Sequence, residues 1–365
     1  MRLHNDTGMW TTGAPPSVPP LAAVLEVAGA VLTWPVDDAD AAPQIVFTDV
    51  ARADWLWRVV GPAGHEAVVA ALLEGEPDTD NGTVDLPDVD VESGSLATLR
   101  RLALGHWLRR WWPASRQDGI ADLDGALLDG ELALLTEATQ EFFDDDAFDA
   151  DVTDLLRPHA PLFTLLARHD DSRVAELAQS CLALAEDTGV AVGEALEAVA
   201  AERRRDDYAL AAGPGVRRQG EAIAEGRDSV RWSAVPPGVF DAAEDTVAWS
   251  VVGDGTTVAA VVRTEVWGAV SPVGIPVQFR SGGYTGAGAL NDAGAATVPL
   301  FDGETPVSED AAWDHDWSGA AVIVGADADE SRSARDRVRS MARARLAAAG
   351  ADAFLAELLA ADTDY

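Results

Sequence analysis

The stretch VAWSVVGDGTTVAAVV, residues 247–262, decides the fold of the C-terminal part of the chain. Before its glycine-rich turn apolar residues stand at every second position, and after it valine recurs between smaller or polar residues: Val247, Trp249, Val251, then Val258, Val262 and, just beyond, Val266. A period of two is that of a β-strand with one buried face. The turn, Gly253-Asp254-Gly255, has the residues that tight hairpins favour. The stretch therefore predicts a β-hairpin.

Three more short strands are expected after the hairpin, with no helix between them. They cover residues 275–279, 296–300 and 320–325, and the turn Asn291-Asp292-Ala293-Gly294 precedes the second of them. Short, regularly spaced strands of this kind are typical of a β-sandwich. We therefore expect a β-sandwich over residues 236–327.

Three segments of this region carry a family resemblance. IPVQF (275–279), GALNDAGAATVPL (288–300) and AAVIVG (320–325) are similar to segments of immunoglobulin-like (Ig-like) and carboxypeptidase-regulatory-like β-sandwiches. The resemblance spans residues 258–325, under a fifth of the chain, and the glycine-rich segment 282–288 departs from its pattern. It implies a packing or interaction module without catalysis.

The expected fold class is α+β with several domains: a mostly helical N-terminal two-thirds, an Ig-like β-sandwich and a C-terminal helical tail. Apolar residues three or four apart predict helices over residues 21–31, 95–112, 124–143, 152–167, 172–185 and 192–212. The expected divisions are an extended lead-in (1–20), a small α/β unit ending in an acidic loop (21–93), a helical bundle (94–212), a linker (213–235), the β-sandwich (236–327) and the tail (328–365).

Charge and composition exclude several chemistries. The 365 residues include 62 acidic and 26 basic ones, a net charge of -36, and every basic residue is arginine. A chain without lysine cannot be a Schiff-base enzyme, a P-loop protein or a protein kinase. Its negative charge repels nucleic acid over most of the surface, so we do not expect a nucleic-acid partner.

The cysteine count and the apolar runs predict a cytoplasmic location. The single cysteine, Cys181, is typical of a protein from a reducing compartment. The longest apolar run, residues 21–34, is interrupted by Glu26 and is too short to span a bilayer. The first residues carry no signal pattern, so we expect neither secretion nor a membrane span.

A basic and aromatic segment, residues 100–116, contains no acidic residue and is the first candidate binding site. Arginine binds phosphate and carboxylate groups through paired N–H donors. The candidate binding residues are Arg100, Arg101, His106, Arg109 and Arg110. In the alternative interpretation the tryptophans belong to the core and the arginines pair with the protein's own carboxylates.

The C-terminal tail offers a second basic surface. Residues 331–350 contain six arginines and one acid, Asp336. Helical spacing places four of them in one stripe: Arg332, Arg335, Arg339 and Arg343. Because the nearest concentrated acid is the protein itself, we expect this stripe to dock within the molecule, with an outward-facing stripe as the alternative.

Two histidine motifs stand out. His169 and Asp170 are adjacent, as in the metal-dependent HD phosphohydrolases that this pair resembles, and His159 could supply a further ligand. In the alternative, purely structural interpretation, one helix ends at His169 and the next helix is capped by Asp171 or Ser172. The segment 313–317, WDHDW, suits a cation or a sugar ring, unless its tryptophans fold back onto the sandwich.

Taken together, the residues form no complete catalytic motif, and we expect neither an enzyme nor a bound cofactor. The first hypothesis is a non-catalytic, intracellular interaction or scaffold protein with protein partners. One rival is a metal-dependent phosphohydrolase centred on His159, His169 and Asp170. The other is a phosphate-binding or nucleic-acid-binding protein that uses the helix at 100–116.

Overall fold

The computed structural model describes residues 1–6, 8–13, 18–38, 41–74, 82–92, 94–143, 149–191, 222–268 and 270–362. Contacts between Cα atoms divide them into two compact units. Over the described residues, unit 1 contains 1–112, 123–191 and 340–362, and unit 2 contains 113–122 and 222–339. The helix expected at 192–212 and the first part of the linker expected at 213–235 lie outside the described residues.

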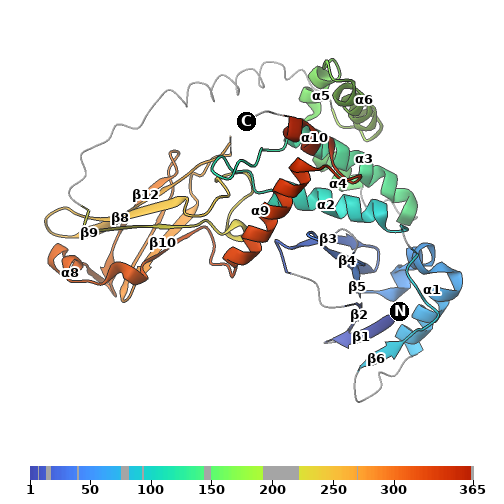
Figure 1. Ribbon diagram of the computed structural model, residues 1–365, viewed down its shortest axis with the longest axis horizontal. Helices are drawn as coiled ribbons and strands as arrows, with labels where there is room; N and C mark the ends of the chain where they lie inside the picture. The colour runs from blue at the N-terminus through green and yellow to red at the C-terminus, as the bar shows by residue number, and fades with distance from the viewer. Residues whose placement is uncertain are drawn as a thin grey trace. The chain divides into compact units, whose positions relative to one another are not determined.

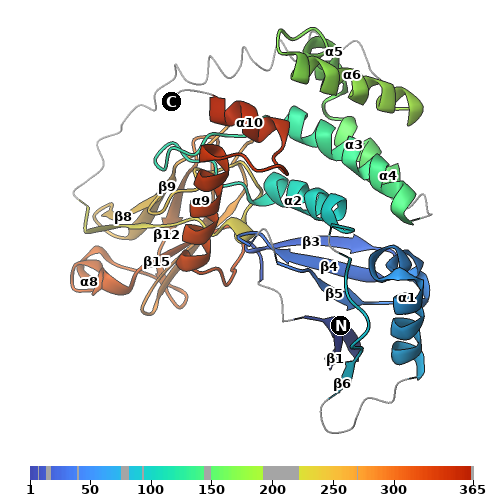
Figure 2. The same cartoon turned by 45° about the vertical axis from the view of Figure 1, so that its right-hand side comes forward.

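Unit 1 is built on a six-stranded antiparallel sheet with the order β3-β4-β5-β2-β1-β6 (Figure 2). Its strands are β1 (Arg2–Asp6), β2 (Met9–Thr12), β3 (Ala22–Val27), β4 (Ala30–Pro35), β5 (Gln44–Phe47) and β6 (Thr83–Asp85). In β3, Leu25 and Val27 are buried while Val24 and Glu26 are exposed, which is the alternation of a strand with one covered face.

The prediction of a mostly helical N-terminal two-thirds was wrong, because the N-terminus is rich in strands. The segment 1–20, expected to be an extended lead-in, contains β1 and β2, and the helix expected at 21–31 is the β3–β4 hairpin. An apolar run does not by itself distinguish a buried helix from buried strands. Gly29 decides for strands: its φ is 73°, and a Cβ there would overlap the backbone oxygen of Asp49.

Helices cover the rest of unit 1. They are α1 (Trp57–Glu74), α2 (Ala97–Trp111), α3 (Gly125–Phe143), α4 (Asp149–Leu156), α5 (Ala160–Leu166), α6 (Ser172–Asp187) and α10 (Leu355–Asp362). Helix α2 packs against β3, and α3 packs against α2, α4, α6 and α10. The single helix expected at 152–167 is divided into α4 and α5 around Pro158, which lacks the N–H that a continuous helix needs.

Unit 2 contains two antiparallel sheets, with the orders β12-β9-β8-β7 and β14-β13-β11-β10-β15 (Figure 1). The strands are β7 (Ala224–Asp228), β8 (Val247–Gly253), β9 (Val258–Thr264), β10 (Pro276–Ser281), β11 (Tyr284–Ala289), β12 (Ala295–Pro299), β13 (Phe301–Asp302), β14 (Thr305–Pro306) and β15 (Ala321–Val324). Inward side chains of both sheets share one core, in which the rings of Trp249 and Phe279 lie 5.4 Å apart. Unit 2 also contains the short helix α8 (Glu309–Trp313).

The C-terminal tail forms α9 (Arg332–Ala347) and α10. Residues 332–339 of α9 belong to unit 2, and residues 340–347 belong to unit 1. Among the described residues, no helix combines the length and the apolarity needed to cross a membrane.

Candidate functional site

Helix α2, which carries the predicted basic and aromatic segment, buries most of its apolar side chains. Leu99, Leu102, Trp107 and Leu108 are all at most 3% exposed. The indole Nε1 of Trp107 donates a hydrogen bond of 2.7 Å to the backbone oxygen of Pro20, just before β3. Trp107 is therefore a core residue of unit 1.

The first two arginines of α2 differ in how firmly they are held. Arg101 contacts Glu131, donates to the backbone oxygens of Asp352 and Ala353, and lies over the ring of Phe354, 4.9 Å from its centroid. The contacts of Arg100 with the described residues are long, at 3.5 Å to the carboxylate of Asp352 and 3.4 Å to the backbone oxygen of Asp38. Arg101 is fixed in place, and Arg100 is held loosely.

Farther along α2, His106 and Arg109 lie near a buried carboxylate that was not predicted, Asp129. Asp129 of α3 is 5% exposed, and it pairs with Arg109 through Oδ1 and with His159 Nε2 through Oδ2, the latter at 3.0 Å. Burial, with a smaller effect of Arg109, lowers the pKa of His106. Arg110 lies over the ring of Trp111, 4.3 Å from its centroid. This cluster ties α2, α3 and the start of α5 together.

The candidate metal ligands do not come together. His159 pairs with the carboxylate of Asp129, whereas His169 and Asp170 are exposed and precede α6. The Nδ1 of His169 accepts a hydrogen bond from the backbone N–H of Asp171. Asp171 caps α6, as the structural interpretation of this segment predicted. No three His, Cys, Asp or Glu side chains of the described residues form a group that could hold a metal ion.

Two arginines of α9 in unit 2, Arg335 and Arg339, converge on Glu244. Arg335 donates to both of its carboxylate oxygens at 2.8 and 2.9 Å, and Arg339 donates to one at 2.8 Å. Arg335 and Arg339 also pair with Glu330 and Asp118, respectively, and their side chains are only 7% and 4% exposed. Burial alone would raise the pKa of Glu244, but hydrogen bonds from Arg335, Ser229 and Arg339 outweigh it and lower the pKa to about 2.

The other two residues of the predicted basic stripe remain at the surface. Arg332 is 65% exposed and reaches Glu244 only at 4.0 Å, and Arg343 is exposed in the half of α9 that belongs to unit 1. The stripe is thus divided into two buried and two exposed arginines.

The WDHDW segment folds back onto unit 2 at two of its five positions. His315 Nε2 lies 2.9 Å from the hydroxyl of Ser281, and its ring packs against Tyr284 and Trp317. Trp317 donates its Nε1–H to the backbone oxygen of Ala312, whereas Trp313 is 53% exposed. Ser281 is 1% exposed, and its bond to His315 holds the WDHDW segment against the end of β10.

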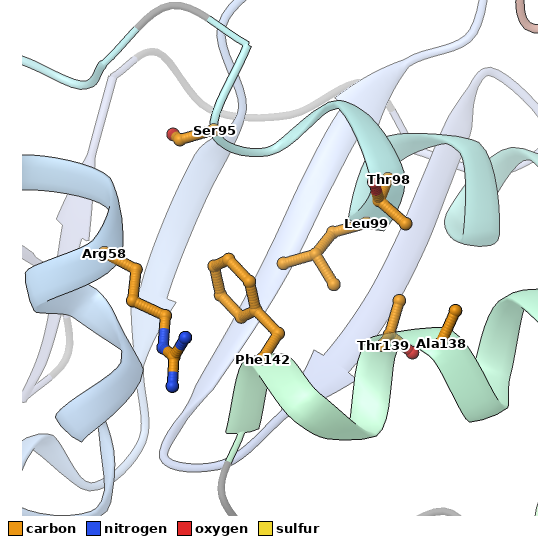
Figure 3. A pocket seen from close by; sticks show the side chains of 7 residues that line it. All are labelled: Arg58, Ser95, Thr98, Leu99, Ala138, Thr139 and Phe142. Carbon is orange, nitrogen blue, oxygen red and sulfur yellow. The ribbon is translucent and has the colours of Figure 1, made fainter.

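A pocket of about 240 Å³ opens in unit 1 between α1, α2 and α3 (Figure 3). Arg58 projects from α1 toward the ring of Phe142, and its guanidinium carbon lies 5.8 Å from that ring's centroid. The other lining residues are Ser95, Thr98, Leu99, Ala138 and Thr139. Arg58 also lies over the ring of Trp57, so its guanidinium packs against two aromatic rings at the wall of the pocket.

Unit 2 carries a larger groove of about 540 Å³ along β7, β8 and β9. Strand register puts three of its residues in one row, because Arg227 pairs with Ala248 and Ala248 pairs with Arg263. Both arginines are exposed, and Ala248 between them is half-buried. In the next row Glu225 pairs with Ser250, and Ser250 with Val261.

Neither the acids that organise these sites nor the groove itself was predicted from the sequence. A carboxylate inside the apolar run ALLDGELALL (126–135) was the available signal for Asp129, because a charged residue on a buried helix face needs a partner. The row of Arg227 and Arg263 had no comparable signal, because only the strand pairing brings these distant residues together.

Comparison with known proteins yields no relative: no family model, no curated protein and no solved structure matches this chain.

Proposed function

We propose that the chain is a non-catalytic interaction protein, and that the groove on β7, β8 and β9 binds an extended acidic segment of a partner protein. The observation that carries the proposal is the row of Arg227, Ala248 and Arg263, in which two exposed arginines flank a small residue.

The row suits a carboxylate. Neighbouring strands lie about 4.8 Å apart, so the two arginine backbones are separated by roughly 10 Å, a gap that two long side chains can close on a shared anion. The methyl group of Ala248 leaves that space open. The backbone oxygen of Asp245 holds Arg227 through a 3.1 Å hydrogen bond, which limits the guanidinium's motion before a ligand arrives.

An extended segment fits because β7 is an edge strand in the order β12-β9-β8-β7. A peptide can add to such an edge through backbone hydrogen bonds, and its alternate side chains then meet the sheet's face. Opposite charges facing each other across strands are stabilising. A glutamate of the added strand opposite Arg227 would have this arrangement, and its side chain would reach back across β7 toward Ala248, where Arg263 can share its carboxylate.

Charge also favours an acidic segment at this place. The charged residues that line the groove are Glu225, Arg227 and Arg263, a local net charge of 2 - 1 = +1 in a chain of -36. An acidic segment is repelled by most of the protein and attracted here. We place the interaction in the cytoplasm, because a single cysteine in 365 residues is typical of a reducing compartment.

The test is fluorescence anisotropy with a short labelled peptide in which glutamate alternates with valine. We expect saturable binding that weakens with salt and falls about tenfold or more in the double variant Arg227→Gln, Arg263→Gln. The matched control is Arg231→Gln with Arg280→Gln, which removes two unit 2 arginines that pair with Asp327 instead of lining the groove. Equal binding of a glutamine-for-glutamate peptide, or equal loss in both double variants, would refute the proposal.

A further inference from the structure

We propose a second, independent binding site in unit 1: the pocket beside Arg100 binds a small monocarboxylate with an apolar body. The pocket has a volume of about 470 Å³. That is within the range of roughly 300–1,000 Å³ that small-molecule sites occupy. This inference does not depend on the groove of unit 2.

The walls of the pocket are mainly apolar. Apolar lining comes from β4, from the segment that precedes β5 and from the residues that lead into α2: Trp34, Ala41, Ala42, Pro43, Val91, Leu96 and Ala97. A hydrocarbon chain or an aromatic ring placed against them leaves water, at a gain of about 25 cal/mol per Å² of apolar surface. The lining of the pocket can therefore bind the apolar part of the ligand.

The guanidinium of Arg100 is placed to bind the ligand's carboxylate. Its side chain is 20% exposed and lines the pocket, and its Nε is buried without a hydrogen-bond acceptor among the described residues. Within the described part of the chain, its Nη2 has one long contact, at 3.4 Å to the backbone oxygen of Asp38. Nε and Nη2 form the edge of a guanidinium that binds a carboxylate side-on through two parallel hydrogen bonds.

The neighbouring charged residues Asp352 and Arg101 do not contact the Nε–Nη2 edge of Arg100. The carboxylate of Asp352 lies 3.5 Å from Nη1 of Arg100, on the other edge, and also pairs with Arg345 at 3.3 Å. Arg101 is held by Glu131 and by two backbone oxygens. A ligand carboxylate on the Nε–Nη2 edge would leave the contact between Nη1 and Asp352 in place.

The same geometry selects a monocarboxylate over a phosphate. One planar arginine edge matches the two oxygens of one carboxylate. A phosphate dianion would place a second charge beside Asp352 and Glu92, which also line the pocket, with no further cation to receive it since Arg101 is already paired. The ligand therefore carries one negative charge.

Isothermal titration calorimetry on the full chain tests the site, with decanoate and 1-naphthylacetate as the aliphatic and aromatic probes. Decanamide is the uncharged match, and acetate and inorganic phosphate are the anions without an apolar body. We expect at least one of the two acids to bind about tenfold or more tightly than decanamide, and neither small anion to bind.

Three variants locate the binding. Arg100→Gln should weaken binding of the acid about tenfold or more, and Ala97→Phe should abolish it by filling the pocket. Arg110→Gln, on the same helix but away from the pocket, is the control and should bind as the wild type does. The melting temperature of each variant without ligand shows that it is folded.

Three results would overturn the inference. The first is that neither acid gives saturable binding at millimolar concentration. The second is that decanamide binds as tightly as the acids, and the third is that Arg110→Gln loses as much affinity as Arg100→Gln. None of them would affect the peptide experiment on unit 2, because Arg227 and Arg263 belong to the other unit.

Discussion

Arg335 and Arg339 of α9 differ in burial from the arginines of the β7–β9 groove, although all of them belong to unit 2. Arg335 and Arg339 come from the densest basic segment of the chain, yet they are buried against Glu244. Arg227 and Arg263 are far apart in the sequence and lie side by side with only Ala248 between them, exposed at a groove. A high local density of arginine therefore indicates neutralisation of the protein's own acids here, and the candidate binding surface arises from strand register.

Glu244→Gln should have the largest effect on stability. It leaves two buried guanidiniums without their shared anion, and breaking a buried ion pair costs about 3–5 kcal/mol. Because Arg335 keeps Glu330 and Arg339 keeps Asp118, we expect about 3 kcal/mol. Urea unfolding followed by circular dichroism would measure it. A loss below about 0.5 kcal/mol would mean that the network of α9 does not stabilise unit 2.

Acid should remove the same contribution. Because the folded-state pKa of Glu244 is lowered to about 2 from an ordinary value near 4.5, its contribution to stability is complete above pH 4.5 and is lost as the pH falls toward 2. The difference in unfolding free energy between the wild type and Glu244→Gln should therefore shrink over this interval. A difference that stays constant from pH 5 to pH 2 would contradict the lowered pKa.

Asp129→Asn tests the corresponding buried carboxylate of unit 1, with a smaller expected effect. Its partner Arg109 is 46% exposed and can turn to water, so we expect about 1–2 kcal/mol of destabilisation in urea unfolding. Asp154→Asn is the matched control, because the Asp154–Arg157 pair is exposed on both sides and should be worth less than about 0.5 kcal/mol. Equal effects of the two variants would show that the burial of Asp129 does not matter.

The smallest effects should come from exposed arginines. Arg332→Gln removes a residue of the same helix that reaches the same Glu244, but at 4.0 Å and 65% exposed, so it should cost about 0–1 kcal/mol. The double variant at Arg227 and Arg263 should likewise unfold within about 0.5 kcal/mol of the wild type. If either variant approached the loss of Glu244→Gln, the contrast between buried and exposed arginines would fail.

How much of the fold could be predicted depended on local signals. The hairpin at 247–262 has an alternating first strand and a glycine turn, and the observed strands β8 and β9 extend only two residues beyond that range, to Thr264. Residues 21–35 contain the same kind of hairpin, but its turn is marked only by Ala28 and Gly29 inside an apolar run, so the period of a helix fitted equally well. Helices with clear ends, such as α6 after Asp171, were placed correctly at their start.

The candidate sites were predictable only in part, for a different reason. Sequence spacing put Arg335 and Arg339 on one helical stripe but could not identify Glu244, which comes from a distant part of the chain. Nor could it distinguish Arg101, which is held by Glu131 and Phe354, from its neighbour Arg100. Which arginine is neutralised depends on tertiary contacts that no periodicity records.

Hydrogen exchange with and without the acidic peptide tests the central claim, that unit 2 binds an extended acidic segment along β7. Backbone amides of an edge strand exchange readily on their unpaired side and are protected when a new strand pairs there. We predict slower exchange in residues 224–228 when the peptide is bound, and no such change in the Arg227→Gln, Arg263→Gln variant. Unchanged exchange over 224–228 with the peptide bound would contradict the account.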